Sequence, residues 1–126
     1  MKKIVIINVD DVCFKTIVKE GKKEEILISV DEFENLLKRV CKEENKVVYI
    51  SRKNQDEVRE KLRLNGYKES NIYIIHDDLR KDDFVYVLGM IKEYFKVRVD
   101  DIVYVGRNEK DLKESESFGI KKSLIV

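Results

Sequence analysis

Short apolar runs alternate with amphipathic stretches along almost the whole chain. The apolar runs are rich in valine and isoleucine, which is typical of buried β-strands, and they span residues 3–9, 46–50, 71–76, 101–106 and 122–126. The stretches between them repeat apolar residues three and four positions apart, as one face of a helix does, and they span 31–43, 55–67, 82–95 and 109–120. Strands that alternate with helices predict an α/β fold whose parallel sheet is covered on both faces.

One segment departs from this alternation. Residues 14–29 follow the first strand and read as a β-hairpin with its turn near Gly21. The helix after the hairpin is expected to be capped by Asp31. The chain contains no proline and shows no internal repeat, so we expect one domain over residues 1–126, with the hairpin as its flap.

Composition and charge exclude several classes of protein. Charged residues make up 40% of the chain, but acids and bases are interleaved and the net charge is only +1, so neither a nucleic-acid nor a membrane surface is expected. No apolar run is long enough for a membrane-spanning helix or a signal peptide. Cys13 and Cys41 form no CxxC pair, and we expect a cytoplasmic protein with reduced thiols. His76 is the only histidine, which excludes histidine-based zinc sites and Ser-His-Asp triads.

Polar residues of the types that bind ligands or catalyse reactions follow the predicted strands. In parallel α/β sheets ligands bind at the carboxyl ends of the strands. Those ends here carry Asn8, Asp10 and Asp11 after the first strand, Ser51 and Arg52 after the second, His76 to Asp78 after the third, and Gly106, Arg107 and Asp111 after the fourth. Any metal at such a site would be a hard, oxygen-bound cation such as magnesium.

Four stretches, taken in order, resemble the motifs of the haloacid dehalogenase (HAD) superfamily of phosphohydrolases. The stretch "IINVDDV" with the hairpin matches the first motif, and "VVYIS", ending at Ser51, matches the second. Lys81 is the best candidate for the lysine of the third motif, and "VYVGRNEKDLKESESFGI" matches the fourth. The resemblance implies a three-layer α/β/α Rossmannoid sandwich. Its five-stranded parallel sheet would have the order 5-4-1-2-3, with a hairpin flap and no cap domain.

Two positions depart from that family pattern. In the family the first aspartate of the first motif is the nucleophile and a magnesium ligand, and Asn8 stands there. Arg107 stands where the fourth motif has a metal-binding aspartate. Asp10 keeps the acid/base position, and Asp10 and Asp111 would be the metal ligands if magnesium bound. A carboxamide is not a competent nucleophile for phosphoryl transfer, and a guanidinium repels a cation.

The sequence therefore favours a catalytically degenerate member, a pseudo-phosphatase that serves as a binding or regulatory module without a cofactor. A phosphate-like anion could still be held without metal by Ser51, Arg52, Lys81 and Arg107. Alternatively, Asn8 is a buried asparagine satisfied by the backbone, and Arg107 pairs with Asp10 or Asp111 and closes the site.

Two other functions stay open at this point. One is a working magnesium-dependent phosphatase in which Asp10 or Asp11 takes over the chemistry. The other is a receiver-like signalling domain, which would have the strand order 2-1-3-4-5. The hairpin carries more apolar residues than a two-stranded flap can bury within itself. We therefore expect it to contact a second subunit or a protein partner through Phe14, Ile17, Val18, Ile26, Leu27 and Ile28.

Overall fold

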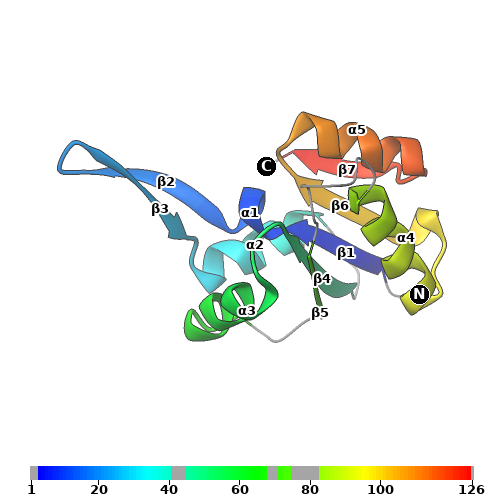
Figure 1. Cartoon of the computed structure of the whole chain (residues 1–126), viewed down its shortest axis with the longest axis horizontal. Helices are drawn as coiled ribbons and strands as arrows, with labels where there is room; N and C mark the ends of the chain where they lie inside the picture. The colour runs from blue at the N-terminus through cyan, green and yellow to red at the C-terminus, as the bar shows by residue number, and fades with distance from the viewer. Residues whose placement is uncertain (1–2, 41–44, 68–70, 75–82, 126) are drawn as a thin grey trace.

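The fold is an α/β sandwich with a protruding hairpin (Figure 1). The computed structural model describes residues 3–40, 45–67, 71–74 and 83–125. In chain order the elements are β1 (Lys3–Asn8), α1 (Val9–Val12), β2 (Phe14–Lys19), β3 (Lys22–Leu27), α2 (Val30–Val40), β4 (Asn45–Ser51), α3 (Gln55–Leu64), β5 (Asn71–Ile74), α4 (Asp83–Phe95), a 3₁₀ turn (Val99–Asp101), β6 (Ile102–Gly106), α5 (Glu109–Phe118) and β7 (Lys122–Ile125). The alternation of strands and helices read from the sequence is thus confirmed.

The main sheet has five strands in the order β5-β4-β1-β6-β7, and every pairing is parallel. Counted along the chain without the hairpin, the order reads 5-4-1-2-3 from the β7 edge. The first strand lies between the second and the fourth, whereas a receiver-like sheet places it between the second and the third. The receiver-like alternative is therefore wrong.

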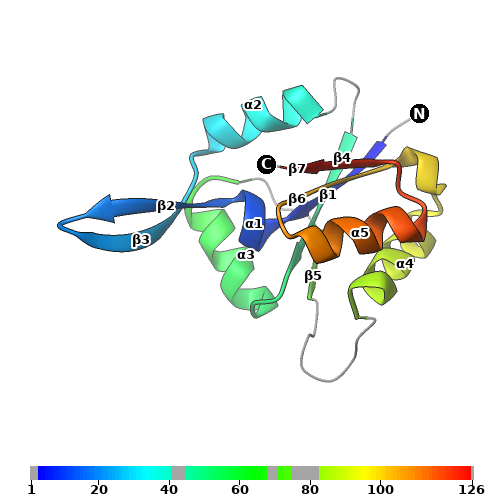
Figure 2. The same ribbon diagram turned by 90° about the horizontal axis from the view of Figure 1, so that it is seen from above.

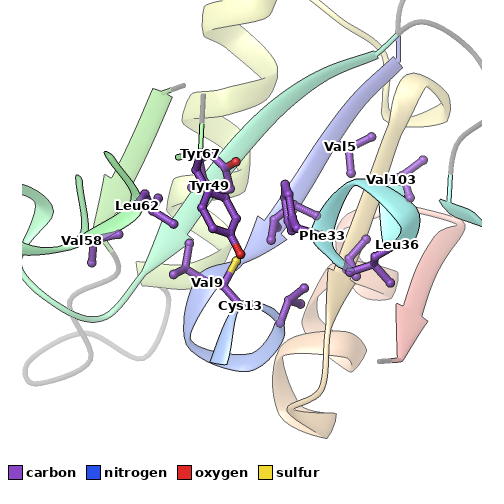
Figure 3. Close-up of a cluster of buried hydrophobic side chains, with 13 residues drawn as sticks. Val5, Val9, Cys13, Phe33, Leu36, Tyr49, Val58, Leu62, Tyr67 and Val103 are labelled. Atoms are coloured by element: carbon purple, nitrogen blue, oxygen red, sulfur yellow. The ribbon is translucent and has the colours of Figure 1, made fainter. Parts of the chain in front are cut away.

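Helices cover both faces of the sheet, which makes three layers (Figures 1 and 2). Because strand side chains alternate between the two faces, β1 sends Val5 and Ile7 into one core and Ile4 and Ile6 into the other. The first core lies against α2 and α3 and contains Phe33, Leu36, Val58 and Leu62 (Figure 3). The second core lies against α4 and α5 and contains Phe84, Val87, Leu88, Ile91 and Leu112.

The hairpin β2–β3 forms a separate two-stranded sheet that extends away from the sandwich in both views (Figures 1 and 2). Its turn is made by Glu20 and Gly21, which both have positive φ angles of 53° and 76°. Two successive positive φ angles are the signature of the type I′ turn that suits a two-residue hairpin loop. The predicted hairpin and its turn are therefore confirmed.

The hairpin is tied to the sandwich at its base. The backbone N–H of Ile28 donates to the carbonyl of Cys13 at 2.8 Å. Phe14, Leu27 and Ile28 pack against the α2–α3 core, whereas Val18 near the tip is 72% exposed. About half of the apolar residues that suggested a partner are thus covered by the protein's own core.

Two local expectations are corrected by the structure. Helix α2 begins at Val30, and the Ser29 hydroxyl accepts a hydrogen bond of 3.1 Å from the Glu32 N–H, so Ser29 and not Asp31 caps it. The run read as a strand to residue 9 ends at Asn8, because Val9 already begins the one-turn helix α1. Among the described residues, no helix is long and apolar enough to cross a membrane.

Candidate functional site

The carboxyl edge of the sheet is built around the end of β1. The strand ends at Asn8, and α1 then turns the chain so that Asp10 and Asp11 face the ends of the neighbouring strands. Ser51 ends β4 and Gly106 ends β6, on either side of β1. The residues predicted to converge after the first, second and fourth strands therefore lie together at this edge.

Asn8 is completely buried and is held by side chains. Its Nδ2 group donates to the Tyr104 hydroxyl at 3.1 Å and to Asp111 Oδ2 at 3.5 Å. Its Oδ1 atom has no hydrogen-bond partner within the described part of the chain. An orphaned buried acceptor costs about 1–3 kcal/mol, so this position is not optimised for folding stability. The alternative of an asparagine satisfied by the backbone does not describe this geometry.

Asp10 is bonded to the end of β4. Its Oδ1 atom accepts from the Ser51 hydroxyl at 2.8 Å, and its Oδ2 atom accepts from the Arg52 backbone N–H at 2.9 Å. Ser51 is itself fully buried, and its Oγ also accepts from the Lys53 N–H at 3.0 Å. The donors expected to receive a phosphate oxygen therefore already hold a carboxylate of the protein.

Arg52 and Asp111 form an ion pair at the site. Arg52 Nη1 and Nη2 each donate to one Asp111 oxygen at 2.9 Å, in the two-pronged geometry that suits a guanidinium and a carboxylate. The Asp111 side chain is only 1% exposed and the Arg52 side chain 28% exposed. Asn108 caps α5 and accepts from the Asp111 N–H at 3.2 Å, which fixes the start of the helix that carries Asp111.

Asp11 and Arg107 meet through the backbone. Asp11 Oδ2 accepts from the N–H groups of Arg107 at 2.9 Å and of Asn108 at 3.2 Å. The Arg107 residue is exposed. The cation that contacts Asp111 in a fork is therefore Arg52, a residue the sequence suggested as a phosphate ligand.

Tyr104 is a site residue that the sequence reading missed. It lies two residues before Gly106 on β6, so the two residues face the same side of the sheet. A Cβ atom on Gly106 would lie 2.6 Å from the Tyr104 hydroxyl, so the tyrosine occupies the space above the glycine. A large polar side chain two positions before a strand-ending glycine was the available signal. Lys81 and His76 to Asp78 lie outside the described residues.

Burial sets the acidity of the groups beneath the site. Burial, reinforced by the charge of Asp10, raises the pKa of the Cys13 thiol to about 12. Burial also raises the pKa of the Tyr104 hydroxyl well above its usual range, although its hydrogen bond with Asn8 opposes the rise. Cys13 is therefore a packed thiol rather than a nucleophile, as its contacts in Figure 3 illustrate.

The donor set does not fit a magnesium ion. Asp10 and Asp111 use both carboxylate oxygens in hydrogen bonds, and a guanidinium already neutralises Asp111. Among the buried side-chain oxygens of the described residues, only the neutral Asn8 Oδ1 is without a partner, and a hard cation takes six or more oxygen ligands. Within the residues that the structure describes, no group of three His, Cys, Asp or Glu side chains is placed to hold a metal.

Known proteins resemble this chain in structure, but neither sequence comparison finds a match. No protein-family model and no curated protein matches the sequence. Among solved structures, 3-deoxy-D-manno-octulosonate 8-phosphate phosphatase from Moraxella catarrhalis, determined with magnesium, phosphate and KDO, has a TM-score of 0.56 and 17% identity, over 89% of this chain and 61% of its own. A candidate HAD family hydrolase from Streptomyces avermitilis has a TM-score of 0.60 and 16% identity, over 94% and 64%.

A hypothetical protein from Xanthomonas campestris has a TM-score of 0.58 and 14% identity, over 97% of this chain and 62% of its own. The chain thus spans about three fifths of the length of the structures that it matches. Identities this low speak for the fold alone, and the same fold follows from the motif order and the sheet topology. The protein therefore has the fold of the haloacid dehalogenase superfamily.

Proposed function

We propose that this protein is a catalytically degenerate HAD-fold module that acts by binding rather than by phosphoryl transfer. The observation that carries the proposal is the Arg52–Asp111 fork beside Asn8. The guanidinium of Arg52 supplies the positive charge next to Asp111. Asn8, at the nucleophile position of the family, is a buried carboxamide. A phosphatase of this fold needs a carboxylate and a metal in those two roles, so neither part of the chemistry is supplied.

The backbone of the site supports the same conclusion. Asp10 occupies the Ser51 hydroxyl and the Arg52 N–H, while Asp11 occupies the N–H groups of Arg107 and Asn108. These are four of the donors that a phosphate group would use in such a site. Binding of a phosphate-like anion would have to displace a carboxylate from them. We therefore expect such binding to be weak, with Arg107 and Lys81 among the groups that it would use.

The test is calorimetry with magnesium and, separately, with inorganic phosphate, together with a chromogenic phosphomonoester assay on the same preparation. We expect no magnesium binding, phosphate binding no tighter than about 1 mM, and no turnover above buffer. An Asp10→Asn variant is the matched control, because a true activity of this site depends on Asp10 whereas a contaminating phosphatase does not. Turnover that requires magnesium and disappears in Asp10→Asn would establish the working phosphatase instead.

A binding module needs a surface, and the hairpin remains our proposal for one. Val18 and the four charged residues Lys22 to Glu25 are exposed on a two-stranded sheet, and within the described residues each of its strands pairs only with the other. The outer edges of such a sheet pair readily with another strand. Replacement of Val18 by Asp should leave the stability unchanged, because the side chain is 72% exposed, and should weaken capture of a hairpin partner.

A further inference from the structure

Helix α4 has a second apolar stripe that faces away from the core. The buried face contributes Phe84, Val87, Leu88 and Ile91 to the core below the sheet. On the outer side, Tyr86 is 62% exposed, Met90 40% and Tyr94 67%. These are three of the five large hydrophobic residues found exposed in the described part of the chain, and they follow one another at intervals of four residues. Such a row on one helix is a patch rather than scattered surface residues.

The stripe has the same pattern in both directions. Read forward or backward from Met90, a tyrosine follows after four residues. A second copy of the helix laid antiparallel across the first therefore places Met90 against Met90 of the other copy, and Tyr86 of each against Tyr94 of the other. Two-fold interfaces require this self-complementarity, and rows of residues four apart interlock when helices cross at about −50°.

Gly89 provides the space for this crossing. A Cβ atom built on Gly89 would meet nothing within 4 Å in the part of the chain that the structure describes, so no contact there requires a glycine. A glycine inside a helix costs about 1 kcal/mol relative to alanine. Gly89 lies beside Met90 in the neighbouring row and leaves a gap in the helix surface, where the methionine of a second helix can sit.

The helix dipoles favour an antiparallel arrangement. In an antiparallel pair the positive end of each helix dipole lies toward the negative end of the other, whereas a parallel pair would bring like ends together. Lys92 and Glu93 are neighbours in the last turn of α4, so the side-chain charges at that end do not select a direction.

We propose that the outer face of α4 is a self-association surface, occupied by α4 of a second copy of this chain. Two tyrosines and a methionine with these exposures bury roughly 300–400 Å² per copy. The total of roughly 600–800 Å² is below the 1,200–2,000 Å² of a standard stable interface. The dimer is therefore weak and forms at high local concentration, with a dissociation constant on the order of 0.1–1 mM. The surface lies at the opposite end of the molecule from the hairpin (Figures 1 and 2), so contacts at the two ends can be tested independently.

The experiment is sedimentation equilibrium from about 0.02 to 2 mM on the whole chain and on single variants. Met90→Lys places like charges against each other across the two-fold axis and should raise the dissociation constant at least about tenfold. Leu64→Lys is the matched control, because Leu64 is 69% exposed on α3 and should leave association unchanged.

Gly89→Ala separates association from folding. It should raise the midpoint of thermal unfolding of the dilute protein by about 2–5 °C, and it should weaken self-association because the added methyl group fills the gap. A protein that stays monomeric to 2 mM, or self-association abolished by Leu64→Lys or Val18→Asp but not by Met90→Lys, would overturn the proposal. If Gly89→Ala associates as strongly as the wild type, the proposed crossing of the two helices at Gly89 is overturned.

Discussion

The guanidinium of Arg52 holds the carboxylate of Asp111 through two hydrogen bonds of 2.9 Å, across the end of the central strand. Arg52 follows β4 and Asp111 lies in the first turn of α5, on opposite sides of β1. Asn8 at the end of β1 touches the same carboxylate at 3.5 Å. The three residues thus link three segments of the chain around a nearly solvent-free charge, and this link joins β1, β4 and α5 at the carboxyl edge of the sheet.

Removal of Arg52 should destabilise the protein more than simultaneous removal of both charges. Arg52→Ala leaves Asp111 buried without its cation, and we expect a loss of about 2–4 kcal/mol in the free energy of unfolding. Arg52→Ala with Asp111→Asn should recover at least about 1 kcal/mol of that loss, because no uncompensated charge remains. Urea unfolding of the wild type, the two single variants and the double variant gives the coupling energy between Arg52 and Asp111. A coupling energy near zero would show that the ion pair does not stabilise the fold.

Asn8→Asp should make stability depend on pH in the acid range. The new carboxylate would be buried beside Asp111, whose charge Arg52 already balances, so burial raises its folded-state pKa above the unfolded value. A carboxyl whose pKa is raised on folding favours the folded state while it is protonated. Its stability contribution is therefore present below the unfolded pKa of about 4 and is lost as the pH rises through the folded value.

The corresponding measurement is the difference in unfolding free energy between Asn8→Asp and wild type from pH 4 to pH 8. We expect the variant to be about 1–3 kcal/mol less stable at pH 7, with the gap narrowing toward pH 4. Asn8→Ala is the control, because it removes the hydrogen bonds without adding a titrating group. If Asn8→Asp and Asn8→Ala show the same pH profile, the pKa of the introduced carboxyl does not change on folding, and the expected effect of burial is contradicted.

The alkaline limit of stability should depend on buried thiol and phenol groups. Burial raises the pKa of Cys13 to about 12 and raises those of Tyr49, Tyr67 and Tyr104 above their usual range. These groups release protons more readily when unfolded, so stability is full below pH 9 and falls as the pH rises from there. Cys13 alone contributes a slope of about 1.4 kcal/mol per pH unit between its unfolded and folded pKa values.

Cys13→Ala should remove the part of this pH dependence that is due to the thiol. The unfolding free energy of the variant should therefore fall less steeply than that of wild type between pH 9 and pH 10. At neutral pH the variant will be less stable than wild type because a buried side chain is shortened. The difference between variant and wild type should therefore shrink as the pH increases. A constant difference would indicate that the thiol is not protected from ionisation in the folded protein.

Gly106→Ala should be destabilising even though no unusual backbone angle requires a glycine there. Its added methyl group would lie 2.6 Å from the Tyr104 hydroxyl and 2.9 Å from the ring. Shifting the tyrosine would disturb its hydrogen bond with Asn8, and we expect a loss of about 1–3 kcal/mol in unfolding free energy. Gly89→Ala, measured at low concentration, is the matched control and should be stabilising, because the space around Gly89 is open.

The sequence predicted the architecture well because the determining signals are local. Val and Ile runs, helical spacing, and the glycines that end α3 and α5 with positive φ each fix one element. The pairings within the site were not predictable in this way. Arg52 and Arg107 both follow a strand, and only the three-dimensional path of β4 relative to α5 decides that Arg52 reaches Asp111. For the same reason Asp11 was given no structural role, although its carboxylate holds the backbone after β6.

The last prediction concerns how many changes separate this site from a metal site. From the sequence alone, Asn8→Asp together with Arg107→Asp should restore magnesium binding, since these two positions depart from the family pattern. The structure adds a third requirement, because Arg52 would still neutralise Asp111. Arg52→Ala in addition would release that carboxylate beside two new ones, and their mutual repulsion favours a hard cation.

Calorimetry with magnesium on wild type, the double variant and the triple variant is the measurement, with circular dichroism to confirm that each is folded. We expect binding at least about tenfold tighter in the triple variant than in the double, since one more anionic ligand is available. Weak phosphomonoester turnover should appear, if at all, only in variants that carry Asn8→Asp, because only they supply a nucleophile. Equal magnesium affinity in the double and triple variants would show that Arg52 is not the barrier, and three folded proteins without affinity would show that ligand geometry, rather than charge, has been lost.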